Sequence, residues 1–111
     1  VKKKVKYKIK YTKRKFKGGY IGMNSEAARQ LKIPFKHKQP KHTIVIYDKS
    51  SKGVKRTTIE HEKAESYFVR ALGMGRKKSH YNALRFEKLD KPFPQENIRR
   101  ELKNMGFKII W

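Results

Sequence analysis

The chain contains no cysteine, few acidic residues and no long apolar run. Without cysteine it has neither a disulfide framework nor a thiolate zinc finger. No apolar stretch approaches the roughly 18 residues that a membrane span requires. The basic N-terminal residues are not followed by the apolar segment of a signal peptide. We therefore expect a soluble protein without a membrane span, located in the cytoplasm.

Acidic residues are scarce: nine Asp and Glu accompany 31 Lys and Arg, which gives a formal net charge of +22. A domain this basic attracts polyanions. One candidate partner is therefore nucleic acid, bound through the basic N-terminal strands with Tyr7, Tyr11 and Tyr20 stacking on bases. Lysines along an edge strand also prevent aggregation between sheets, and this structural explanation, a solvated strand face, is the favoured interpretation of the lysine pattern.

The strand and helix patterns predict a single domain over residues 1–111, long enough for one modest core. Residues 1–56 are predicted to be mainly β with one short helix, residues 57–105 to be helical, and residues 106–111 to form an apolar C-terminal tail. Strands come first and helices follow. The expected class is therefore α+β, with a small N-terminal sheet of three to four strands followed by three to four helices.

Two segments carry the clearest strand patterns. Residues 5–11 alternate apolar side chains with lysines, which is the period of a half-buried strand. Residues 43–47 (TIVIY) are continuously apolar or β-branched, which predicts burial on both faces and a central place in the sheet. An extended peptide pairing with this second strand would contact Thr43, Val45 and Tyr47.

The second half predicts three helices, over about residues 58–72, 77–89 and 95–105, with Thr57 or Thr58 capping the first. Within the first helix, residues 60–65 read EHEKAE and hold three of the nine carboxylates. His61 and Glu65 lie on one face of that helix, one turn apart, with Glu62 beside them. The pattern is HExxE, close to the HExxH of zinc peptidases.

These residues predict a zinc site. Catalytic zinc takes three protein ligands and a water molecule, and a carboxylate serves as well as an imidazole. His80, on the next predicted helix, is the candidate third ligand beside His61 and Glu65. Glu62 would take a proton from the zinc-bound water and pass it to the leaving amine. Glu87, on the same helix face as His80, would accept a hydrogen bond that sets the tautomer of a liganding histidine.

A structural explanation of the acidic run is the alternative. In a lysine-rich chain, Glu60, Glu62 and Glu65 would pair with Lys or Arg on neighbouring turns. His61 would then be a surface or capping residue. Under the nucleic-acid hypothesis this helix has only such a structural role.

The C-terminal tail carries Phe107, Ile109 and Trp111, and so apolar an end must be docked. It forms a final strand or a part of the core, or it lies in a functional groove or a neighbouring subunit. The last arrangement would make a homodimer.

Three segments resemble the minigluzincins, very small archaeal single-domain proteins related to gluzincin zinc metallopeptidases: residues 57–65 (TTIEHEKAE), 73–75 (GMG) and 79–87 (SHYNALRFE). The resemblance covers about residues 43–111. It implies a zincin-like fold in which a small sheet precedes the active-site helix and a helix supplying the third ligand. That ligand would be His rather than Glu, which matches His80. The resemblance also implies latency enforced by the C-terminal segment ending in Trp111, whereas Glu65 departs from the usual second His.

The sequence thus predicts a metallopeptidase with Zn²⁺ as cofactor and a peptide or protein as substrate, latent where the tail blocks the site. A basic nucleic-acid-binding protein is the alternative.

Overall fold

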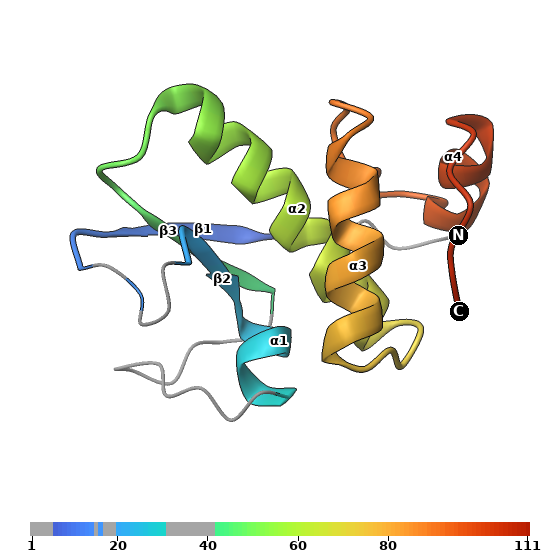
Figure 1. Cartoon of the computed structure of the whole chain (residues 1–111), viewed down its shortest axis with the longest axis horizontal. Helices are drawn as coiled ribbons and strands as arrows, with labels where there is room; N and C mark the ends of the chain where they lie inside the picture. Colours follow the sequence, from blue (N-terminus) through green and yellow to red (C-terminus); the bar gives the residue numbers. More distant parts are fainter. Residues whose placement is uncertain (1–5, 15, 17–19, 31–41) are drawn as a thin grey trace.

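The structure is a computed structural model that describes residues 6–14, 16, 20–30 and 42–111. It contains a three-stranded sheet, a short helix between the second and third strands, and three helices after the sheet (Figure 1). The elements are β1 (Lys8–Thr12), β2 (Gly22–Asn24), α1 (Ser25–Gln30), β3 (Thr43–Tyr47), α2 (Lys52–Arg70), α3 (Arg76–Glu87) and α4 (Ile98–Asn104). The expected α+β class is confirmed. No helix among the described residues is long and apolar enough to cross a membrane.

The sheet has the order β1-β3-β2, with β3 parallel to β1 and antiparallel to β2. Ile44 and Ile46 of β3 are completely buried, as the continuous apolar run predicts for a central strand. Ile44 pairs with Ile9 of β1, and Val45 pairs with Met23 of β2. The continuously apolar or β-branched strand β3 thus lies between β1 and β2 in the sheet.

Helix α2 begins at Lys52, six residues before the predicted start at residue 58, so the predicted boundary at residue 56 is wrong. The cap is Ser51, whose hydroxyl oxygen accepts the backbone N–H of Val54. A helix start is stabilised when a side chain satisfies one of its free N–H groups, and Ser51 does this earlier than either threonine. Thr57 instead lies inside the helix, where its hydroxyl donates to the Gly53 carbonyl.

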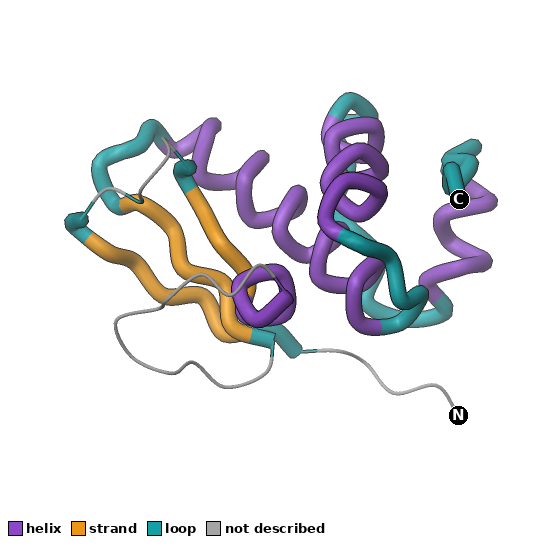
Figure 2. The backbone as a smooth tube through the Cα atoms, turned by 60° about the horizontal axis from the view of Figure 1, so that its bottom comes forward, coloured by secondary structure: helices purple, strands orange, loops and turns teal. Residues whose placement is uncertain are grey.

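The larger core lies on the helical side of the molecule, where α2, α3, α4 and the C-terminal tail meet (Figure 2). Four phenylalanines pack there in edge-to-face and stacked pairs. They are Phe68, Phe86, Phe93 and Phe107. This cluster fixes α3 against the second half of α2, which is the helix pair that carries the predicted zinc ligands.

The first half of α2 packs closely on β2 at Gly22. A Cβ atom at this position would lie 2.6 Å from Cγ2 of Thr58 and 3.5 Å from Cγ of Glu62. Only a residue without a side chain allows so close an approach. Glycine at this position therefore brings β2 against the helical turn that carries Glu62.

Candidate metal centre

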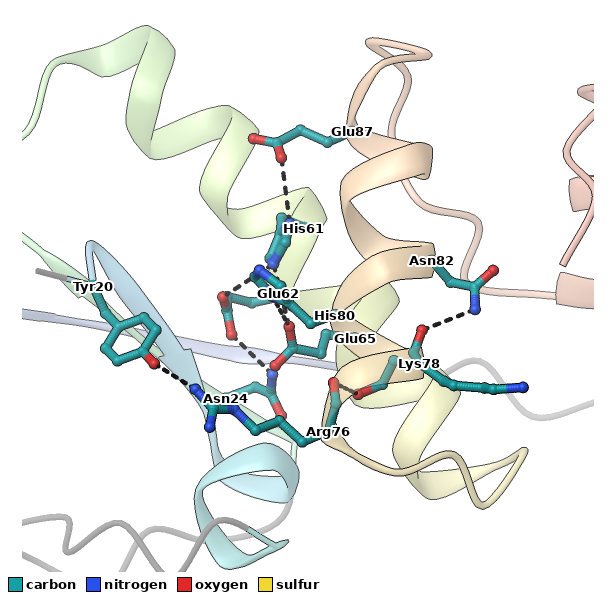
Figure 3. A network of polar contacts seen from close by, with 11 residues as sticks. Tyr20, Asn24, His61, Glu62, Glu65, Arg76, Lys78, His80, Asn82 and Glu87 are labelled. Atoms are coloured by element: carbon teal, nitrogen blue, oxygen red, sulfur yellow. Dashed lines mark hydrogen bonds and ion pairs between the residues drawn. The ribbon is translucent and has the colours of Figure 1, made fainter. Parts of the chain in front are cut away.

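The three predicted ligands converge between α2 and α3 (Figure 3). Oε2 of Glu65 lies 3.2 Å from Nε2 of His61 and 3.0 Å from Nδ1 of His80. The three ligand atoms all lie within 4.8 Å of one another. In a tetrahedral site with metal–ligand bonds of about 2.0–2.2 Å, adjacent ligand atoms are about 3.4 Å apart. The cluster therefore has the dimensions and the donor atoms to hold one metal ion.

The turn between α2 and α3 brings His80 to the other two ligands. Gly73 adopts a left-handed conformation (φ 65°) just after α2, and the N–H of Met74 bonds back to the carbonyl of Phe68. This arrangement ends a helix and reverses the chain, and it favours glycine because L side chains rarely adopt such a φ. Helix α3 then runs back along α2, and the rings of His61 and His80 meet edge to face, 5.1 Å apart.

Glu87 lies at the other ring nitrogen of His61. Its Oε2 is 3.4 Å from Nδ1, on the side of the ring away from Glu65 (Figure 3). When the ring is neutral, as a metal ligand must be, a carboxylate at this place favours the tautomer with a proton on Nδ1, which leaves the lone pair of Nε2 directed at the cluster. With Nδ1 facing Glu87, Nε2 of His61 is the ring nitrogen available to a metal ion.

Glu62 is the fourth titratable group of the cluster. One of its carboxylate oxygens accepts a hydrogen bond of 2.8 Å from the Asn24 side-chain amide, and the other lies 4.0 Å from Nε2 of His61. Burial and the neighbouring charge of Glu65 raise the pKa of Glu62 to about 7, against the opposing effects of His61 and Asn24. A carboxyl group with this pKa accepts and donates protons efficiently near neutral pH.

Glu65 is shifted in the opposite direction. Burial alone would raise its pKa, but the hydrogen bonds from His61 and His80 and their positive charges lower it to about 2. For His61, burial favours the neutral ring, yet the bond to Glu65 and the nearby carboxylates raise its pKa above the ordinary value. The two carboxyl groups therefore differ in charge: Glu65 is an anion suited to bind a cation, whereas the raised pKa of Glu62 would allow it to exchange a proton near neutral pH.

A pocket of about 260 Å³ opens onto the cluster. It lies between β2 on one side and α2 and α3 on the other. Its lining includes Tyr20, Ile21, Gly22, Met23, Thr58, Arg76 and the ligand cluster with Glu62 and Glu87. The guanidinium of Arg76 donates to the hydroxyl of Tyr20 at 2.9 Å and so connects α3 to the residues preceding β2. The pocket leaves room for a fourth ligand at the cluster.

Compared with family models, with curated proteins and with solved structures, the chain matches none of them. Its function is therefore inferred from the geometry of the site.

The ion-pair explanation of the acidic run holds for Glu60. Its carboxylate lies 3.5 Å from the Lys63 ammonium and accepts the backbone N–H of Phe93 at 2.9 Å. Glu62 and Glu65, in contrast, make their contacts within the described part of the chain with asparagine and histidine. The structure thus separates one structural carboxylate from two that belong to the candidate metal centre.

We predicted that an extended peptide pairs with the strand of Thr43, Val45 and Tyr47. This prediction is wrong, because that strand has no free edge. These residues belong to β3, whose two edges already bond to β1 and β2. A central strand has no free N–H or C=O groups for a further strand. The sequence indicated the central place of β3 but not which strand would lie beside the cluster, and that strand is β2.

Asn24 was not predicted as a site residue. Its place before the short helix indicates a cap, whereas the structure puts it at the end of β2 with its amide on Glu62. The two residues are 38 positions apart, and no local pattern connects them. The burial of Asn24, which only the structure shows, marks it as a polar residue that needs a partner.

The C-terminal tail docks on α3 on the side away from the candidate metal ligands. Phe107 is buried in the core, and the side chain of Asn82 bonds both the N–H and the carbonyl of Ile110, each at 2.8 Å. Figure 3 shows Asn82 pointing from α3 in the direction opposite to the cluster. Phe107, Ile109 and Trp111 do not line the pocket at the cluster. Inhibition by the tail stays a prediction, and within one molecule it would require the tail to leave α3.

Proposed function

We propose that this protein is a zinc-dependent metallopeptidase, with His61, Glu65 and His80 as metal ligands and Glu62 as the proton-transfer group. The observation that carries the proposal is the convergence of these four side chains at one pocket. Two histidines, one carboxylate and an open position form a donor set of catalytic zinc sites. Glu62 lies beside this set without belonging to it.

A bound zinc ion would lower the pKa of a water molecule and polarise a carbonyl group. The chain itself would contribute a base, Glu62, beside the metal ligands. Asn24 holds one oxygen of Glu62 and leaves the other 4.0 Å from Nε2 of His61. With a pKa near neutrality, Glu62 can take a proton from a nucleophile and give it to a leaving amine.

The order of the elements supports the resemblance to the minigluzincins. A small sheet precedes the helix with the HExxE pattern, and the following helix carries His80. Zinc is the metal that this resemblance implies, and the His and carboxylate ligands suit it.

The substrate would lie along β2. Among the described strands, β2 pairs with β3 alone, and residues 20–23 line the pocket. An extended peptide can add to such an edge through main-chain hydrogen bonds. A peptide in this place would pass the metal ligands and Glu62, which is where hydrolysis requires its scissile bond.

The first test is zinc binding by purified protein, measured by metal analysis and by competition with a chelating dye. We expect one zinc ion per chain, and we expect His80→Ala to weaken binding by at least about 100-fold because only two of the three ligands remain. Tyr81→Ala is the matched control, since Tyr81 is the next residue on α3 and is exposed. Equal zinc affinity in the His80→Ala variant and the wild type would refute the ligand set.

The second test separates metal binding from catalysis. Glu62→Gln should keep zinc, because Glu62 is not a ligand, and should lose cleavage of a quenched fluorescent peptide library by about 100-fold or more. Full activity in Glu62→Gln, or absence of cleavage by zinc-loaded wild type with and without residues 108–111, would contradict the proposed function.

A further inference from the structure

A second surface lies at the end of the sheet where α2 begins. Strands β1 and β3 are parallel, so their carboxyl ends lie side by side, and the N–H of Asp48 donates to the Thr12 carbonyl. Figure 1 shows the chain leaving both strands at this end, away from α3. The segments that leave the strands and the first two turns of α2 carry six cationic side chains, which we call the basic end: Lys13, Arg14, Lys49, Lys52, Lys55 and Arg56.

An exposed aromatic ring lies among these cations. Tyr11 is 55% exposed and lines a shallow groove of about 320 Å³ together with residues of α2. The α2 residues of the groove are Lys52, Lys55, Arg56, Ile59 and Glu60. The ammonium of Lys55 lies 5.6 Å from the centre of the Tyr11 ring, a cation–π distance. An aromatic ring beside cations is the arrangement that binds a base and its phosphates.

The acidic groups near the groove already have partners. Asp48 lies 3.4 Å from the Lys55 ammonium, and Glu60 is paired with Lys63 at 3.5 Å. Glu60 also accepts the N–H of Phe93. Asp48 offsets one cation of the basic end, Lys55, and Glu60 is offset by Lys63 outside it, so the basic end keeps a net positive charge in a chain of net charge +22.

The other two tyrosines considered for stacking have different environments. Tyr7 is partly buried, its hydroxyl donates to the Lys63 carbonyl, and burial raises its pKa. Tyr20 is held by Arg76 at the mouth of the metal-centre pocket. Tyr20 is exposed as well, at 38%, but Tyr11 is more exposed, at 55%, and has the ammonium of Lys55 over its ring rather than a cation bonded to its hydroxyl.

We propose that the basic end binds single-stranded nucleic acid, with a base stacked on Tyr11 and the flanking phosphates held by cations of the basic end. A single strand fits better than a duplex because stacking requires a base whose face is free. Stacking is sequence-tolerant, and the cations contact the backbone, so the binding should depend strongly on salt and weakly on sequence. This function uses neither the metal ligands nor Glu62.

The test is fluorescence anisotropy of a short fluorescein-labelled oligodeoxythymidine at low salt. Tyr11→Ala should weaken binding by about 5- to 100-fold, the loss of one stacked base, and Tyr11→Phe should keep most of the affinity. Tyr81→Ala is the matched control. Tyr81 is 53% exposed and has Arg85 above its ring at 5.9 Å, but it lies on α3. Because Tyr11 and Tyr81 are both exposed, neither alanine variant should impair folding.

The salt dependence tests the cations. Lys52→Ala/Arg56→Ala should reduce the slope of log affinity against log salt by about 0.7 for each phosphate that the variant no longer neutralises. The matched control is Arg99→Ala/Lys103→Ala, which removes the same charge from the exposed face of α4 and should leave the slope unchanged. Addition of EDTA should change none of these values, which separates this proposal from the zinc proposal.

Four outcomes would overturn the proposal. The first is absence of binding at low salt, and the second is an equal loss of affinity in Tyr11→Ala and Tyr81→Ala. The third is an equal salt slope in the two double variants. The fourth is a duplex of the same length that binds as tightly as the single strand and without dependence on Tyr11. Anionic lipid vesicles are included as a comparison. Tyr11-dependent binding to vesicles without binding to the oligonucleotide would assign the surface to membranes instead.

Discussion

At the scale of single residues, the candidate metal centre depends on how each side chain of the cluster is oriented. His61 contacts Glu65 through Nε2 and Glu87 through Nδ1, at 3.2 and 3.4 Å. The ring therefore has a carboxylate at each nitrogen, and the two contacts have different purposes. Glu65 would share the metal, whereas Glu87 sets the tautomer and the orientation of the ring.

Glu87→Gln tests that orientation. The substitution keeps the size of the side chain and removes its charge, so His61 loses its preference for a proton on Nδ1. We expect zinc affinity to fall by about 10- to 100-fold, as for other residues that support a liganding histidine. Glu96→Gln, at an exposed position outside the cluster, is the control for the loss of one negative charge. Unchanged zinc affinity in Glu87→Gln would show that Glu87 does not orient His61.

Residue spacing along a helix predicts which side chains share a face, and part of the candidate site follows from this spacing. His61, Glu62 and Glu65 were predicted from one helical repeat, because i and i+4 positions of a helix always share a face. His80 and Glu87 were predicted to share a face of the next helix for the same reason. The contact of Asn24 with Glu62 has no such periodic basis, and the sequence did not indicate it.

At the scale of secondary-structure elements, the packing of β2 on α2 sets how closely β2 approaches Glu62. Gly22→Ala should lower the free energy of unfolding by about 1–3 kcal/mol, since its Cβ would clash with Thr58. Adding Thr58→Ser, which removes the clashing methyl group, should recover part of this stability.

Gly53 in α2 gives the opposite prediction. A Cβ atom at this position would meet nothing within 4 Å, so Gly53→Ala should raise the free energy of unfolding by about 0.5–1 kcal/mol. Chemical denaturation measures all of these changes.

The contacts of Glu26 in α1 with the residue before β3 predict how the stability of the fold depends on pH. Glu26 accepts the Ser25 hydroxyl at 2.6 Å and the His42 backbone N–H at 2.9 Å. Burial opposes its ionisation, but these bonds and the His42 charge lower its pKa below the ordinary value of 4.5. A lowered pKa in the folded state stabilises the fold above pH 4.5, and this contribution is lost as the pH falls through the folded-state value.

Glu26→Gln should therefore destabilise the protein at neutral pH by about 1–3 kcal/mol, because hydrogen bonds to a buried carboxylate are replaced. The difference from wild type should shrink as the pH falls below 4.5. Urea denaturation of both proteins over this range measures it, with Glu96→Gln as an exposed control. A difference independent of pH would mean that the charge of Glu26 is not involved.

At the scale of the whole molecule, the tail has a structural role that the sequence left open. Phe107 packs parallel to Phe68, with ring centres 6.2 Å apart, and edge to face with Phe86 at 5.7 Å. Trp111, four residues later, is 62% exposed. The tail thus begins in the core and ends at the surface, so its two ends should respond differently to substitution.

Phe107→Ala should lower the free energy of unfolding by about 3–5 kcal/mol, the usual cost of removing a buried phenylalanine. Trp111→Ala should change it by less than about 0.5 kcal/mol. Thermal unfolding of the two variants measures the difference. Equal effects of the two substitutions would mean that the tail does not dock as the structure shows.

The charge is also distributed over the whole molecule in a way that no single segment predicts. The carboxylates of the candidate metal centre lie between α2 and α3, whereas the cations of the basic end lie where β1 and β3 meet the start of α2. One helix therefore carries an acidic and a basic site, separated along its length. This separation allows the two proposed functions to be tested independently.

The sequence by itself determined the α+β class, the buried character of β3 and the candidate metal ligands that lie on one helix. Each of these follows from local periodicity, which depends on neighbouring residues alone. Only the tertiary structure decided that His80 and Glu87 reach His61, that β2 rather than β3 borders the pocket, and that the tail lies behind α3. These features depend on contacts between residues far apart in the chain, and packing of the whole core selects them.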